Sequence, residues 1–317
     1  QVTRYLGVAY PTASDEGMAK LFRSTISQED TDNDGTDETV RSDRSEEFQW
    51  QRSPVASGAW NQQVLAVNLD GTLYAGAAGN GSVRMRRIDT GEDSNGDPVA
   101  DPVWTESLEA TDPLLNGLFA TNTAGIVALG SDGGAVDPGT NIGGEDFYLF
   151  SRNADTGAVD ERLQFGTEDD DRARLSDADG TRFWLAGDQG GPYQGDGSGD
   201  FEEDPEGSPG PFLIAVDGNG NVQGAIHPGD LEDQNGQVGN IQALAVSGDN
   251  AFIAGQTDDD RVFLMGLRYT GSQSGDEPSI EQRWSAIVEG ANAIVDMDNY
   301  RDRKLYLVLD TGAGQRI

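Results

Sequence analysis

The chain has 317 residues and a formal net charge of −35, with 56 acidic side chains against 21 basic ones. It contains no cysteine, which excludes disulfide bonds, thiolate nucleophiles and cysteine-ligated metals. Nucleic-acid binding needs a basic surface, and membrane insertion needs about 18 consecutive apolar residues, so the composition also excludes these two classes of partner.

The basic residues are almost all arginine, since Lys20 and Lys304 are the only lysines. An acidic surface with almost no lysine is typical of proteins in molar salt, where the Debye length is about 3 Å and self-repulsion is screened. We therefore expect a halophilic protein, with an ordinary acidic secreted protein as the alternative. The sequence begins at Gln1 without a methionine, which favours a processed extracellular chain whose signal peptide has been removed.

An acidic motif occupies residues 30–38, between an expected strand at residues 20–22 and another around Trp50. Its oxygens at positions 1, 3 and 5, its glycine at position 6 and its carboxylate at position 9 are typical of a Ca²⁺ loop. It is not an EF-hand, because position 12 is Arg41, and it resembles the calcium hairpins of integrin-type FG-GAP propellers. That resemblance implies side-chain ligands at Asp30, Asp32, Asp34 and Glu38, and a carbonyl ligand at Thr36. The alternative is a solvated acidic hairpin tip.

The next segment of the chain shows a complete pattern of four short strands. They are expected at residues 64–67, 73–76 and 83–86 and around Trp104. Its last hairpin carries a weaker candidate Ca²⁺ site, with fewer oxygens at the required spacing. The candidate ligands of that hairpin are Asp93, Asn95 and Asp97.

The same strands recur along the rest of the chain. First strands are expected at residues 117–120, 172–176, 243–246 and 293–295. Second strands are expected at residues 5–9, 127–130, 184–187, 252–255 and 305–309. Third strands are expected at residues 147–150, 212–215 and 262–265, and fourth strands around Phe165, Ile226 and Trp284.

Four short strands in each unit of about 50–60 residues predict an all-β fold, a β-propeller in which each unit is one blade. The apolar runs are typical of inner strands buried on both faces, and the fourth strand is expected at the rim. Because Trp50, Trp104 and Trp284 recur at one position of the fourth strand, we expect them to pack in the core.

The unit at residues 241–284 and the unit at residues 64–104 resemble the seven-bladed β-propeller repeats of secreted bacterial and archaeal proteins. The second of these units has Asp70-Gly71, an aromatic strand with Tyr74 and Gly76, then Asp89-Thr90-Gly91 and Trp104. The resemblance implies a propeller fold and leaves the activity open.

We expect one domain over residues 1–317 with six blades, the last of them incomplete, and a chain that continues beyond Ile317. The units lie at residues 1–56, 57–110, 111–168, 169–230, 238–290 and 291–317. Five blades are the alternative, in which the strand near residues 292–297 joins the N-terminal blade and residues 304–310 are left over.

Few residues are suited to catalysis. His227 is the only histidine, which argues against a Ser-His-Asp hydrolase and against a zinc site. With 56 acidic residues, carboxylate pairs occur by chance and do not specify a glycosidase. Trp60 and Tyr193 fall outside the repeat, and they are the candidates for an exposed ligand-stacking surface.

The sequence favours a non-enzymatic structural or binding propeller, presented on a cell surface, filament or virion and used for assembly or adhesion. Its expected partners are other protein subunits or surface glycans, with structural Ca²⁺. Two alternatives stay open: a secreted polysaccharide-acting enzyme, either a glycoside hydrolase or a lyase, and a ligand-binding module of a larger secreted protein.

Overall fold

The structure is a computed structural model that contains strands and no helix in the residues that it describes. Within those residues, therefore, no helix has the length and apolar character needed to cross a membrane. The described residues are 2–10, 16–29, 38–51, 62–67, 72–79, 81–88, 102–120, 125–134, 143–178, 182–191, 209–217, 222–226, 232–233, 236–271, 279–300, 304–312 and 315–316.

The described strands form six antiparallel sheets that follow one another along the chain. The first sheet holds β1 (Val2–Tyr10), β2 (Glu16–Glu29) and β3 (Glu38–Gln51). The second holds β4 (Gln62–Val67), β5 (Leu73–Gly79), β6 (Ser82–Ile88) and β7 (Pro102–Glu109). The third holds β8 (Leu114–Ala120), β9 (Gly125–Asp132), β10 (Asp146–Asn153) and β11 (Val159–Phe165).

The last three sheets continue the same order. The fourth holds β12 (Arg172–Ala178), β13 (Arg182–Gln189), β14 (Gly210–Asp217) and β15 (Val222–Ile226). The fifth holds β16 (Glu232–Asp233), β17 (Gly236–Ser247), β18 (Asn250–Thr257), β19 (Val262–Thr270) and β20 (Ser279–Ile287). The sixth holds β21 (Ala293–Tyr300), β22 (Lys304–Asp310) and β23 (Gln315–Arg316). Every strand expected from the repeat is present, and only the two-residue strands β16 and β23 were not expected.

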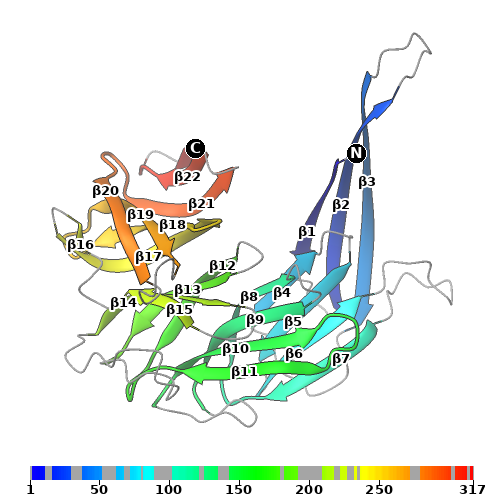
Figure 1. Cartoon of the computed structure of the whole chain (residues 1–317), viewed down its shortest axis with the longest axis horizontal. Helices are drawn as coiled ribbons and strands as arrows, with labels where there is room; N and C mark the ends of the chain where they lie inside the picture. The colour runs from blue at the N-terminus through cyan, green and yellow to red at the C-terminus, as the bar shows by residue number, and fades with distance from the viewer. Residues whose placement is uncertain are drawn as a thin grey trace.

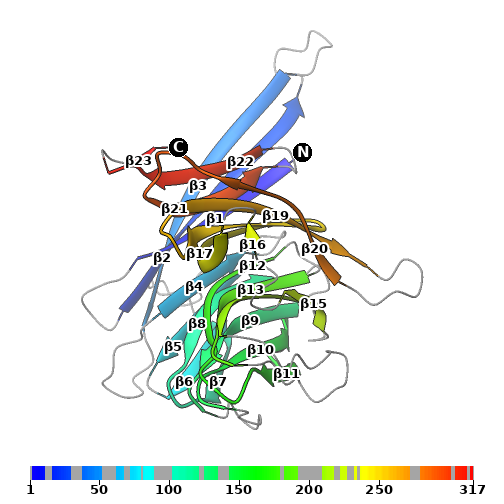
Figure 2. The ribbon, with the colours of Figure 1, turned by 90° about the vertical axis from the view of Figure 1, so that its left-hand side faces the viewer.

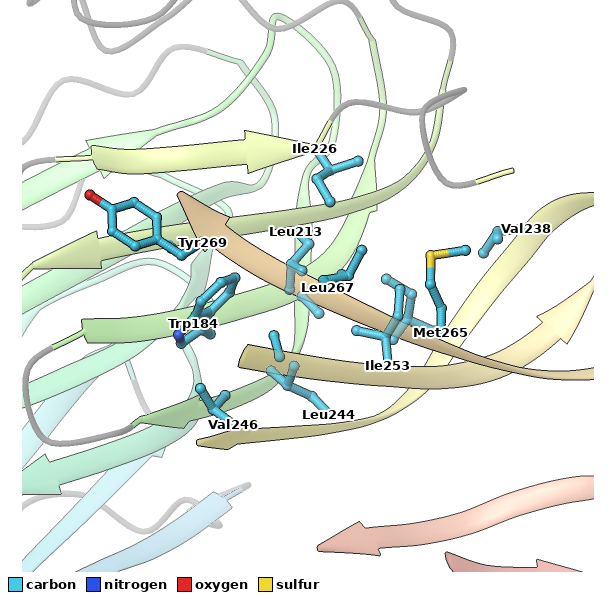
Figure 3. Close-up of a cluster of buried hydrophobic side chains, with 14 of the residues drawn as sticks. Trp184, Leu213, Ile226, Val238, Leu244, Val246, Ile253, Met265, Leu267 and Tyr269 are labelled. Atoms are coloured by element: carbon cyan, nitrogen blue, oxygen red, sulfur yellow. The ribbon is translucent and has the colours of Figure 1, made fainter. Parts of the chain in front are cut away.

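Neighbouring sheets pack face to face, and each such interface from the second sheet onward has its own apolar cluster. Figure 3 shows the cluster between the fourth and fifth sheets, where Trp184, Leu213 and Met265 are buried. Burial follows the predicted order, because β10 and β14 are buried on both faces whereas β20 is mostly exposed. This packing of consecutive antiparallel sheets, three of them four-stranded, confirms the predicted all-β propeller architecture.

The sheets lie along an arc whose two end sheets are apart from each other (Figure 1). Inner strands pack in the series β4, β8, β12, β17 and β21, and β1 packs on β4 as β5 packs on β8. The first sheet therefore begins at the position of a second strand, as predicted. Strand β21 pairs with β22 in the described residues. The number of blades in a closed ring stays a prediction, because β1 and β21 show no comparable packing in the described residues.

Strands β2 and β3 are unusually long for this chain. Each has 14 residues, whereas the third strands β6, β10 and β14 have 7 or 8. Both views show the β2–β3 hairpin extending beyond the other sheets (Figures 1 and 2).

Candidate functional site

One end of the sheets gathers most of the buried polar groups of the described chain. The second strand of each sheet ends at this end. Because adjacent strands run antiparallel, the segment that connects the sheet to the first strand of the following sheet starts at the same end. In the third and fourth sheets this loop face comprises residues 110–113 and 166–171, the end of β9 and the end of β13.

Asp132, at the end of β9, holds the segment that enters the third sheet. Its buried carboxylate accepts hydrogen bonds from the backbone N–H groups of Thr111 at 3.1 Å, Asp112 at 2.7 Å and Gly134 at 3.2 Å. Beside it, Tyr148 donates a 2.6 Å hydrogen bond to the carbonyl oxygen of Leu114. Burial raises the pKa of Tyr148 well above its ordinary value, and the charge of Asp132 raises it further.

Asp171 holds the segment that enters the fourth sheet, as Asp132 holds the one that enters the third. Its buried carboxylate accepts hydrogen bonds from the backbone N–H of Thr167, from the Thr167 hydroxyl at 3.0 Å and from the backbone N–H of Gly190 at 2.9 Å. Burial raises the pKa of Asp171 to about 6 against the opposing effect of these hydrogen bonds, and the charge of Asp146 adds to the rise.

Two buried carboxylates meet at Gly166. A Cβ atom at this position would lie 2.5 Å from Asp146 Oδ1 and 2.5 Å from Asp171 Oδ2, so only glycine leaves room for both. Gln164 supports Asp146 with a 3.2 Å hydrogen bond and also donates to the carbonyl of Gly134 at 2.9 Å. The site thus brings together a pair of carboxylates, and the pKa of one of them, Asp171, is raised to about 6.

Gln189 is a further buried polar group of this face. Its amide nitrogen donates to the carbonyl of Gly191, whereas its oxygen Oε1 accepts no hydrogen bond from the described residues. Within those residues no group of three or more His, Cys, Asp and Glu side chains is arranged to hold a metal ion. The carboxylates of this face can accept hydrogen bonds from backbone N–H groups, and one of them can bind a proton.

Because of Asp171, the free energy of unfolding is expected to fall as pH rises. Its pKa in the folded chain, about 6, exceeds the ordinary value of 3.8, so the folded state binds this proton more tightly than the unfolded state. That contribution is fully present below about pH 4 and is lost as pH rises through about 6, an effect on the order of 2 kcal/mol. Chemical denaturation at about pH 4 and pH 7 should show the loss in the native chain and not in Asp171→Asn. Parallel changes in both proteins would contradict it.

The predicted Ca²⁺ residues lie mostly outside the described residues. Asp30, Asp32, Asp34 and Thr36 belong to residues 30–37, and Asp93, Asn95 and Asp97 belong to residues 89–101. The hairpin that carries the first motif is described on both sides, since Glu29 ends β2 and pairs with Glu38, the first residue of β3. Two acidic residues thus occupy opposite positions beside an acidic loop, an arrangement that a bound cation would stabilise. Trp60 and Tyr193 also lie outside the described residues.

Calcium is expected to bind the 30–38 motif and to stabilise the first sheet. At a Ca²⁺ concentration of about 100 times Kd, the gain in unfolding free energy would be about 2.7 kcal/mol. Calorimetric titration and thermal unfolding, with and without a chelator, measure both effects. The variant Asp32→Asn/Asp34→Asn should lose them, and a native chain that takes up no Ca²⁺ at millimolar concentration would show the prediction to be wrong.

Trp104 is covered by a hairpin of the neighbouring sheet. Its indole N–H donates a 2.9 Å hydrogen bond to the carbonyl of Ala154, in the turn between β10 and β11. Gly157, with a φ of 72°, brings its backbone against the indole, where a Cβ atom would lie 2.8 Å from the ring. Arg87 adds an ion pair of 2.9 Å with Asp155. The predicted core position of Trp104 is confirmed, since it is only 9% exposed.

Trp284 has the same place in the fifth sheet but is 42% exposed. The predicted core position of Trp284 is therefore wrong. Its indole lies over Gly266, where a Cβ atom would lie 2.5 Å from the ring carbon Cε2. No hairpin of the described residues covers it as the β10–β11 hairpin covers Trp104. The third predicted tryptophan, Trp50, is in β3, and its side chain lies outside what the structure describes.

Comparisons with known proteins give distant similarities of fold. No protein-family model matches the chain, and no match is found among curated proteins. Of the solved structures, BamB from Moraxella catarrhalis has a TM-score of 0.40 and 13% identity, covering 94% of this chain and 67% of BamB. A PL25 ulvan lyase bound to -[GlcA(1-4)Rha3S]- has a TM-score of 0.43 and 13% identity, covering 94% and 74%. Hsv2 from Kluyveromyces lactis has a TM-score of 0.41 and 9% identity, covering 88% and 73%. Similarities at this level do not decide the function.

Proposed function

We propose that the chain is a non-enzymatic structural or binding propeller of a halophile, presented outside the cell on a cell surface, filament or virion for assembly or adhesion. The observation that carries the proposal is Trp284, which is 42% exposed although Trp104, at the same place in the second sheet, is covered by the next sheet and is 9% exposed. Val295 on β21 and Tyr306 on β22 are also exposed, at 47% and 45%, but Leu305 and Leu307 face the fifth sheet, so Tyr306 lies on the other face of the sixth sheet. A large aromatic side chain left exposed where the repeat elsewhere buries it is suited to contact with another protein.

The loop face supports the same proposal. Asp132 and Asp171 each accept three hydrogen bonds from backbone or hydroxyl donors, so these carboxylates hold loops in place. A net charge of −35 keeps separate copies apart in dilute buffer and permits close contact in concentrated salt. Other protein subunits are therefore the proposed partners, with surface glycans as a second class.

The mass of the particles in concentrated salt tests this function. Light scattering of the chain at about 1 M salt, where the Debye length is about 3 Å, is expected to show a defined assembly or a complex with a surface partner. A chain that stays a monomer, binds no partner and cleaves a polysaccharide would overturn the proposal.

A polysaccharide-acting enzyme is the second candidate, and it rests on the carboxylate pair at Gly166. A carboxylic acid whose pKa is raised to about 6 beside a second carboxylate is suited to general acid catalysis. If this candidate holds, Asp171→Asn abolishes turnover of an acidic polysaccharide, and Asp188→Asn, a half-buried carboxylate at the end of the neighbouring strand β13, preserves it. If no polysaccharide is cleaved by the native chain, the pair has the structural role only.

A further inference from the structure

The entry segment, residues 166–171, connects β11 to β12 and is fastened to two sheets by polar contacts. Toward the third sheet, the backbone N–H of Asp171 donates a 2.5 Å hydrogen bond to the carbonyl of Glu145, and the backbone N–H of Glu145 donates to Asp170 Oδ1 at 3.1 Å. Toward the fourth sheet, the backbone N–H of Gly190 donates to the carboxylate of Asp171 at 2.9 Å. None of residues 166–171 belongs to the apolar cluster between these two sheets, so the segment can open without disturbing that core.

The entry segment lies on the end of β13, next to a buried acceptor. A Cβ atom at Gly190 would lie 2.5 Å from the carbonyl oxygen of Asp170, and one at Gly191 would lie 2.6 Å from Asp169 Oδ2, so the segment rests directly on this backbone. The neighbouring Gln189 is 2% exposed, and its Oε1 accepts no hydrogen bond from the described residues. A buried acceptor without a donor costs free energy that contact with water recovers. Gln189 therefore favours opening, and the closed state needs a contact that offsets this cost.

The entry segment begins between two buried carboxylates. Asp146 and Asp171 are both 0% exposed. Asp146 Oδ1 and Asp171 Oδ2 each lie 2.5 Å from the place that a Cβ atom would take at Gly166, so the two oxygens are at most about 5 Å apart. Two buried charges at this distance repel each other, and one of the two carboxylates then holds a proton. A carboxylic acid donates a hydrogen bond, which a carboxylate cannot do.

We propose that Asp171 shares a proton with Asp146 and that this proton latches the entry segment, which opens when the proton is lost while the sheets stay folded. In the closed state Asp171 Oδ2 carries the proton and Asp146 Oδ1 accepts the hydrogen bond. When the proton passes to water, two negative charges face each other across Gly166, and opening separates them by moving Asp171 into solvent. This pH-sensitive device is independent of the proposed function in assembly.

Other charged residues surround Asp171 on the elements packed against it, but they are engaged elsewhere or exposed. Two acidic residues pair with arginines, one binds backbone N–H groups, and three lie at exposed positions of the entry segment. They are Glu145 with Arg172, Asp188 with Arg174, Asp132 at the end of β9, and Glu168, Asp169 and Asp170. Burial is the main cause of the raised pKa of Asp171, and Asp146 is the residue whose charge raises it further. Asp146 is therefore the partner in the latch.

The latch is closed at acidic pH and opens as pH rises. The pKa of Asp171 is about 6 in the closed state, against an ordinary value of 3.8 when the carboxyl group is in water. Because the closed state binds the proton more tightly, its stabilisation is fully present below about pH 4 and is lost as pH rises through about 6. This difference raises the equilibrium constant for opening on the order of 50-fold between about pH 4 and pH 8.

Hydrogen exchange of single amides measures the opening. The latch amides are those of Glu145, Asp171 and Gly190, whose hydrogen bonds break when the segment opens. After correction for the intrinsic effect of pH on exchange, their protection is expected to fall on the order of 50-fold between about pH 4 and pH 8. The amide of Leu185, inside the ladder of β13, is the reference. Because local opening exposes little surface, the latch amides are expected to exchange faster than Leu185 and without response to dilute denaturant.

Asp146→Asn tests whether the proton is shared. Its amide nitrogen donates to Asp171 Oδ2 at any pH and removes the opposing charge, while its oxygen still accepts the hydrogen bond from Gln164. The latch amides of this variant are expected to stay protected at about pH 8. Glu168→Gln, which removes one charge from an exposed position of the same segment, is the matched control and is expected to keep the native pH dependence. Asp171→Asn lacks the titrating group, so its latch amides are expected to show no pH dependence.

Three results would overturn the inference. The latch amides of the native chain could keep the same protection at both pH values, or they could exchange only together with Leu185 through global unfolding. Asp146→Asn could lose protection with pH as the native chain does, which would mean that Asp171 binds its proton without Asp146. If Asp146→Asn does not fold, Asp171→Asn decides, because a pH dependence like that of the native chain would show that Asp171 does not control the segment.

Discussion

Replacing Gly130 with alanine is expected to lower the free energy of unfolding by about 3 kcal/mol or more, at the upper end of the usual cost of overpacking. A Cβ atom at this position of β9 would overlap the carbonyl oxygen of Leu114 and lie 2.5 Å from the hydroxyl of Tyr148. Neither group has room to move, because the two are joined by a 2.6 Å hydrogen bond and Tyr148 is fully buried. Chemical denaturation of the purified variant measures the loss.

Gly133→Ala is the matched control, three residues further along the same chain. The nearest atom to a Cβ at Gly133 is 3.8 Å away, which is an ordinary contact. Its cost is expected to stay within about 0.5 kcal/mol, as for other surface substitutions. Equal losses in the two variants would show that backbone flexibility, rather than the overlap with Leu114, explains the need for glycine.

The same overlap explains a glycine that recurs in the sequence. A Cβ atom at Gly187 would overlap the carbonyl of Arg172, and one at Gly255 would overlap the carbonyl of Asn240. In these three sheets the first strand has a bulge near this contact. Gly130, Gly187 and Gly255, which end three of the second-strand runs in the sequence, are therefore required by the first strand of their own sheet.

The strands could be predicted because their signals are local and repeated. Runs of apolar residues bounded by turn residues recur at similar spacing, and a strand as weak as residues 172–176 is identified by its place between stronger ones. The bulges could not be predicted in this way, because a register shift depends on the partner strand rather than on the residues that form it.

The carboxylates of the loop face could not be identified from the sequence. Asp132 binds backbone groups about 20 residues earlier in the chain, and nothing in its neighbourhood distinguishes it from the other acidic residues. Asp171 lies in a run of four acidic residues, 168–171, of which it is the buried one. Burial raises the pKa of Asp171, and that burial follows from packing between sheets.

Trp104 and Trp284 have the same place in the repeat and different environments. The difference lies in the neighbouring sheet, which covers one indole and leaves the other exposed. The repeat does not distinguish the two positions, because the cover over Trp104 comes from a neighbouring sheet and not from the residues around the tryptophan.

Trp104→Ala is expected to destabilise the chain by about 4 kcal/mol, within the range for truncation of a buried tryptophan. The variant loses the packing against Tyr74 and Gly157 and leaves the carbonyl of Ala154 without its 2.9 Å hydrogen bond. The ion pair between Arg87 and Asp155 does not compensate, because Asp155 is mostly exposed and such pairs contribute about 1 kcal/mol or less. Chemical denaturation in dilute protein, where copies stay separate, measures this loss.

Trp284→Ala is the matched control, since Trp284 has the same place in the repeat and a similar aromatic neighbour, and no hairpin of the described residues covers it. Its cost in dilute protein is expected to be about 1 kcal/mol, the average for a single substitution. The difference between the two variants measures what the β10–β11 hairpin contributes through contact with the indole. Equal costs would mean that the contact with Tyr74 and Phe252, common to both tryptophans, accounts for the whole effect.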